Sequence, residues 1–78
     1  MPDLEAELRH LAAAERHVRD ANARIAQLNE LIAYASAMGE STTLARTVLV
    51  TMRDVLINFE AHHDQIVRTL RRIRTRRR

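Results

Sequence analysis

The strongest constraint on the fold is an apolar repeat of seven residues on both sides of a single glycine, Gly39. In the first half, the residues spaced seven apart are Leu4, Leu11, Val18, Ile25 and Ile32, and a second column three residues further on holds Glu7, Ala14, Ala21, Leu28 and Ala35. In the second half, steps of four and three connect Ala45, Leu49, Met52, Leu56, Phe59, His63, Ile66, Leu70 and Ile73. This pattern is typical of helices that pack along a coiled-coil-like seam.

The strongest break in this pattern is the stretch "AMGESTT", residues 37–43. Gly39 suits the left-handed conformation that ends a helix, and the hydroxyl of Ser41 or Thr42 can accept from the first free N–H groups of the next helix. The chain has one glycine and one proline, too few turn residues for a β-protein. We therefore predict an all-α fold, an antiparallel two-helix hairpin in one domain of residues 1–78. Its expected parts are a first helix at about 3–38, a turn at 39–41, a second helix at about 42–74 and an arginine-rich tip at 68–78.

Composition narrows the function classes. The 78 residues include no cysteine, which excludes disulfides and thiolate metal sites, and no tryptophan for stacking on bases. The opening "MPDLEAELRH" lacks the basic and apolar regions of a signal peptide, and the longest wholly apolar run is only five residues, "LIAYA" at 31–35. We expect a cytoplasmic protein without a membrane span.

Apolar side chains exceed what one seam can bury. They flank it on both sides, and we predict that they form an interaction face of Val48, Val50, Val55, Ile57, Leu31 and Met38. A two-helix hairpin cannot cover a helix that is apolar nearly all round. The prediction is a homodimer that forms a four-helix bundle, so that the protein acts as a non-enzymatic structural or interaction protein. The alternative partner is a helix of a different protein.

The sequence predicts no catalytic residue, cofactor or metal. Serines and threonines near the turn lack a placed base, and no glycine-rich phosphate loop is present. A short turn sets residues whose numbers sum to about 80 at the same level, which brings His62 and His63 near His17, with Glu15 and Asp64 close. A metal-binding bundle lined by histidines is therefore the more remote alternative. His63 lies on the seam, where a polar residue more often fixes register.

The stretch "RTLRRIRTRRR", residues 68–78, holds seven arginines and no acid, whereas residues 1–67 hold six arginines and ten acids. One interpretation is the solvated end of the second helix, where cations meet the negative end of the helix dipole. The other is a small nucleic-acid-associated protein, which we hold as the alternative function. The possible phosphate contacts are Arg71, Arg72, Arg74, Arg76, Arg77 and Arg78. The rest of the chain is acidic and would repel phosphates. We therefore expect binding to nucleic acid less than binding to a protein partner.

A resemblance adds to this interpretation. The stretch "ERHVRDANARIAQLNELI", the glycine at 39 and the stretch "TLARTVLVTMRDVL" resemble a group of short uncharacterised bacterial proteins. The resemblance covers about residues 15–56 and rests mostly on heptad spacing. It implies a helical hairpin of bacterial origin and transfers no functional residue.

Overall fold

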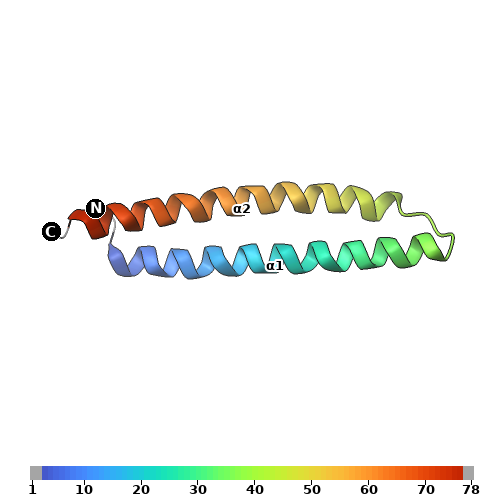
Figure 1. The fold of residues 1–78 in the computed structure, drawn as a ribbon, viewed down its shortest axis with the longest axis horizontal. Coiled ribbons are helices and arrows are strands. Elements are labelled where there is room, and N and C mark those ends of the chain that lie inside the picture. Colours follow the sequence, from blue (N-terminus) through green and yellow to red (C-terminus); the bar gives the residue numbers. More distant parts are fainter. Residues whose placement is uncertain (1–2, 77–78) are drawn as a thin grey trace.

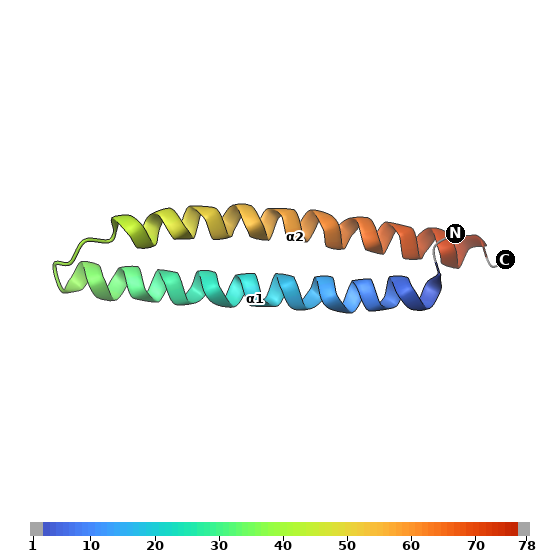
Figure 2. The ribbon, with the colours of Figure 1, turned by 180° about the vertical axis from the view of Figure 1, so that it is seen from behind.

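The computed structural model describes residues 3–76, except for the side chain of Arg76. It contains two α-helices, α1 (Leu4–Ala37) and α2 (Thr43–Arg76). They lie side by side and antiparallel, with the start of α1 and the end of α2 at one end and the turn at the other (Figures 1 and 2). No strand occurs within residues 3–76, so the prediction of an all-helical, two-helix chain is confirmed.

The seam between α1 and α2 forms a narrow core. The buried residues all lie on the predicted columns: Ala14, Ala21, Ile32, Ala35, Leu49 and Ile66. Half of them are alanines of α1, and Ala21 is only 2% exposed. Alanine lets the two backbones approach closely, but each one removes little apolar surface from water. The core is therefore continuous along the hairpin and thin throughout.

The beginning of α1 is capped by Asp3. Its carboxylate Oδ1 accepts a hydrogen bond from the backbone N–H of Glu5 at 3.3 Å, and Glu5 and Glu7 add negative charge to the first turn. Both features stabilise a helix start, because free N–H groups and the positive end of the helix dipole are concentrated there.

The turn has the hydrogen bonds of a Schellman motif around Gly39, whose φ of 74° lies in the left-handed region as the sequence predicts. The N–H of Glu40 donates to the carbonyl of Ala35 at 2.8 Å, and the N–H of Gly39 donates to the carbonyl of Ser36 at 3.1 Å. These two bonds satisfy carbonyls that the end of α1 would otherwise leave free.

The beginning of α2 uses the two hydroxyl residues that the sequence indicates. Ser41 Oγ accepts from the backbone N–H of Thr43 at 3.5 Å, a long bond. The carbonyl of Thr42 accepts from the N–H of Arg46 at 2.9 Å, while its hydroxyl accepts from Arg46 Nε at 2.8 Å. Helix α2 then continues to Arg76, two residues beyond the expected end, because the arginine-rich stretch contains no helix breaker.

The backbone at Gly39 gives the first testable prediction. Gly39→Ala should lower the free energy of unfolding by about 1 kcal/mol, because a side chain disfavours positive φ. An added Cβ meets no atom within 4 Å, so the loss should come from the backbone alone. Gly39→Asn is the matched control, since asparagine tolerates this conformation better, and it should lose less. Thermal or urea unfolding of both variants measures the difference; equal stability of Gly39→Ala and the wild type would contradict it.

Candidate interaction surface

The side chains next to the seam form two long faces, one on each side of the hairpin. Residues seven apart lie on one side of a helix. We name the first side the His17 face, and its rows are His10, His17, Arg24, Leu31 and Met38 of α1 with Val48, Val55, His62 and Thr69 of α2. We name the second side the Glu15 face, and its rows are Leu8, Glu15, Asn22, Asn29 and Ser36 of α1 with Arg46, Arg53, Glu60, Val67 and Arg74 of α2.

Shallow grooves between α1 and α2 agree with this division. On the His17 face, Arg24, Leu31 and Val48 line one groove. A second groove on that face is lined by His10, His17, Asn58, Phe59 and His62. On the Glu15 face, one groove is lined by Glu15, Val18, Arg19, Glu60, His63 and Asp64. Each groove is thus lined by residues of α1 and α2 that belong to the same face.

Exposed apolar side chains are concentrated on the His17 face near the turn. Leu31 is 53% exposed and Met38 is 60% exposed, with Val48 beside them and Val55 half-buried. Tyr34 and Leu44, both exposed, extend the same patch. We name these five exposed side chains the turn patch: Leu31, Tyr34, Met38, Leu44 and Val48. They are five of the eight large apolar residues that are exposed within residues 3–76, so this patch is the main apolar surface described.

The six predicted interaction residues do not form one surface. Leu31, Met38, Val48 and Val55 share the His17 face. Val50 and Ile57, both exposed, lie four residues after Arg46 and Arg53 and so adjoin the Glu15 face. Residues two apart on a helix point about 200° apart, which separates Val48 from Val50.

Three of the four histidines lie on the His17 face. The rings of His17 and Phe59 are stacked, with centroids 4.9 Å apart and an interplanar angle of 26°. His62 lines the same groove, as does His10, whose Nδ1 lies 3.6 Å from Oε1 of Glu7. The stacking restrains the ring of His17.

His63 lies on the seam and opens to the opposite side. Its side chain is 32% exposed, its Nδ1 is 3.8 Å from Oδ1 of Asp64, and it lines the groove with Glu15 and Glu60. His62 and His63 lie at the same height along the hairpin as His17, as expected. However, the side chains of His62 and His63 lie on different faces. Within residues 3–76, no group of three or more histidine, aspartate or glutamate side chains is arranged to hold a metal ion.

Two pairs with Glu-x-x-His spacing, Glu7 with His10 and Glu60 with His63, are signals that the sequence interpretation did not use. This spacing supplies metal ligands in some helical bundles. Here the first pair lies near the tip and the second near the middle of the Glu15 face. The two pairs therefore do not meet within one chain.

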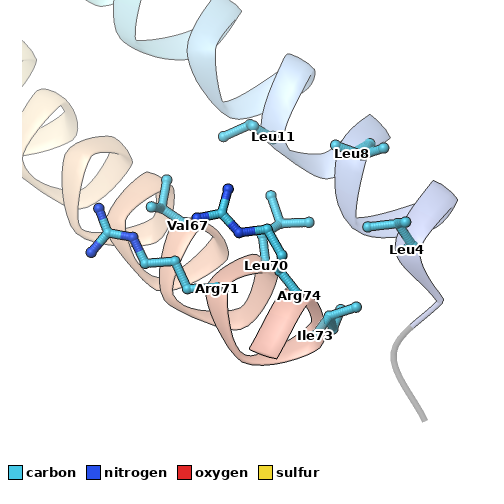
Figure 3. Close-up of a pocket in the computed structure, with 8 residues that line it drawn as sticks. All are labelled: Leu4, Leu8, Leu11, Val67, Leu70, Arg71, Ile73 and Arg74. Carbon is cyan, nitrogen blue, oxygen red and sulfur yellow. The ribbon is translucent and has the colours of Figure 1, made fainter. Parts of the chain in front are cut away.

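At the tip, Leu4, Leu8 and Leu11 of α1 lie opposite Val67, Leu70 and Ile73 of α2, as Figure 3 shows. Arg71 and Arg74 line the edge of this open groove. The exposed arginines of the tip are Arg68, Arg71, Arg72 and Arg74, and none of these four forms an ion pair with an acid of residues 3–76. Of the other predicted phosphate contacts, the side chain of Arg76 and both Arg77 and Arg78 lie outside the described residues.

Comparison of the chain with known protein families, curated proteins and solved structures found no match. The resemblance noted from the sequence stays a prediction. Neither helix within residues 3–76 is long and apolar enough to cross a membrane. The cytoplasmic location stays a prediction, and function has to be argued from the two faces and the tip.

The arginine-rich tip gives the second prediction. Deleting residues 75–78 should change the free energy of unfolding by less than about 0.5 kcal/mol, because Thr75 is exposed and the seam ends at Ile73. We also expect no salt-sensitive binding to duplex DNA at physiological ionic strength, because residues 1–67 are net acidic. Titration of a duplex at two salt concentrations, with intact and shortened protein, checks both points. Affinity that falls with log salt and is lost on deletion would favour the nucleic-acid alternative.

Proposed function

We propose that this protein is a non-enzymatic interaction protein whose working form is a homodimer, in which two hairpins pack through the His17 face into a four-helix bundle. The turn patch is the observation that carries the proposal. In a bundle, a third row of apolar side chains beside the seam is what buries each helix against two neighbours. Leu31, Met38, Val48 and Val55 supply such a row.

The accessible area supports burial against a partner. The hairpin exposes 6258 Å². A compact monomer of 9.0 kDa would expose about 4,900 Å², so the hairpin exposes about 1,400 Å² more than its size requires. A stable interface buries about 800 Å² on each partner. The radius of gyration of 17.7 Å, against about 11.5 Å for a compact domain of this length, has the same cause.

A second copy suits the His17 face because that face is divided along its length. The half near the turn carries the turn patch, the other half carries His10, His17 and His62, and Arg24 lies between them. With both turns at the same end, apolar side chains lie on apolar side chains and imidazoles lie on imidazoles. With turns at opposite ends, Leu31 and Val48 would lie against polar rings, which removes less apolar surface from water.

Repulsion between the two arginine-rich tips opposes this arrangement, but it does not outweigh the burial of apolar surface. Turns at the same end bring two arginine-rich tips to the other end, where like charges repel. Arg68, Arg71, Arg72 and Arg74 are exposed, and at physiological ionic strength repulsion between exposed charges is largely screened beyond about 8 Å. Burial of the apolar rows is not screened. The homodimer should therefore become tighter as salt is added.

The proposal contains no catalytic step. Ser36 and Ser41 are exposed, and neither hydroxyl is hydrogen-bonded to a histidine or carboxylate among the described residues. The grooves on both faces are open rather than enclosed, whereas enzymes usually bury most of a small substrate. The surface is better suited to another helix than to a small molecule.

The homodimer gives the third prediction. Val48→Asp should raise the dissociation constant of the homodimer by about 1,000-fold, since each of the two buried, unpaired carboxylates costs about 2 kcal/mol. Ile57→Asp is the matched control, because Ile57 is an exposed apolar residue of α2 that adjoins the Glu15 face. The homodimer of the Ile57→Asp variant should keep a dissociation constant near the wild-type value. Analytical ultracentrifugation over a range of protein and salt concentrations measures each constant, and circular dichroism checks the helix content.

Two results would contradict the third prediction. A wild-type protein that is a folded monomer at micromolar concentration would exclude the second copy and leave a different protein as the occupant of the face. Dissociation by Ile57→Asp but not by Val48→Asp would move the interface to the Glu15 face.

A further inference from the structure

The grooves of the His17 face point to a site that one chain cannot complete. We propose that the homodimer binds one Zn²⁺ ion on its two-fold axis, through His17 and His62 of both copies. The inference rests on the homodimer proposed above. It assigns a ligand to the half of the face that carries no turn patch.

A single chain supplies half of the ligand set. His17 of α1 and His62 of α2 line one groove across the seam, and the stack on Phe59 restrains the His17 ring in that groove. Structural zinc sites bind four ligands in a tetrahedron, with nitrogen at about 2.0–2.1 Å from the metal. Two imidazoles are too few, in agreement with the lack of a metal-binding group within the described part of one chain.

The heptad repeat places the same two residues at the dimer interface. Leu31 and Val48 line a groove across the seam, and His17 and His62 occupy the same two rows two heptads further from the turn. Two heptads correspond to about 21 Å along a helix. An interface that buries the Leu31 and Val48 rows and continues along the hairpin therefore also covers His17 and His62. With the turns at the same end, these rings lie at one level in both copies.

The chemistry of the covered rings favours a metal ion. Imidazoles removed from water without a partner destabilise an interface. Four neutral imidazoles match the preference of Zn²⁺ for nitrogen ligands, and coordination gives each ring a partner. His10 lies one heptad further from the turn with its Nδ1 toward Glu7, so it flanks the site. Zinc would then link the two chains in the half of the face that carries no turn patch.

The test titrates Zn²⁺ alone into chelator-treated, metal-free protein by isothermal titration calorimetry. We expect one ion per two chains and a higher melting temperature with zinc. His17→Ala and His62→Ala should each weaken zinc binding by more than about 100-fold, because each removes two direct ligands from the dimer and even the loss of an outer-shell partner costs up to about 100-fold. His63→Ala is the matched control, because His63 opens to the Glu15 face, and it should bind zinc as the wild type does.

Ultracentrifugation of the same samples separates the two proposals. A dimer that binds no zinc, or that binds it equally well after His17→Ala and His62→Ala, overturns the site and leaves the dimer standing. A monomer in the presence and absence of zinc overturns both. Zinc binding lost in His63→Ala but kept in His17→Ala would place the ion on the Glu15 face and overturn the site proposed here.

The direction of the two hairpins has its own test. The chain has no cysteine, so Glu40→Cys places one thiol in the exposed turn. With turns at the same end, a bifunctional maleimide much shorter than the hairpin should link the two chains of the metal-free dimer through this residue. With turns at opposite ends of a molecule 62 Å long, the same reagent could not span the two thiols, and the absence of this link would overturn the alignment of the histidines in the two copies.

Discussion

The close approach of α1 to α2 at Ala14, Ala21 and Ala35 is the constraint on which the other features depend. Alanine at these positions makes a regular, continuous seam, but it leaves the hairpin a core that is too thin to hold its larger apolar residues. Those residues lie beside the seam instead, and they give the molecule two faces of different chemistry. The elongated shape, the excess of accessible area and the turn patch all follow from how little the seam encloses.

The repeat of seven residues predicted the two helices, and the interruption at Gly39 predicted the turn between them. Local chemistry was sufficient there, because a left-handed glycine ends a helix regardless of what packs against it. The interaction face was predicted less well, since Val48 and Val50 are close in sequence but point to different sides of α2. Their positions within the heptad distinguish these sides, and the same reasoning separates His62 from His63. The reach of α2 to Arg76 could not be predicted from the apolar pattern, which ends at Ile73.

The two halves of the His17 face have complementary roles in the assembly that we propose. The apolar half supplies affinity without requiring contacts between particular atoms, because burial of apolar surface is not directional. The imidazole half supplies geometry, because metal coordination demands particular atoms at particular distances. A bundle held by both would have a defined register even though its core is rich in small residues. The Glu15 face, with exposed Val50 and Ile57 beside charged side chains, stays available to another partner.

The antiparallel pairing across the seam also sets an order of folding. Leu31 and Val48, which line a groove near the turn, are close in sequence, whereas Leu4 and Ile73 at the tip are separated by nearly the whole chain. The entropy cost of closing a loop rises with its length, so contacts beside the turn should form first and those at the tip last. Pairing of α1 with α2 should therefore begin next to Gly39 and extend towards the tip. Because the turn patch lies at the starting end, two chains could recognise each other before either has finished folding.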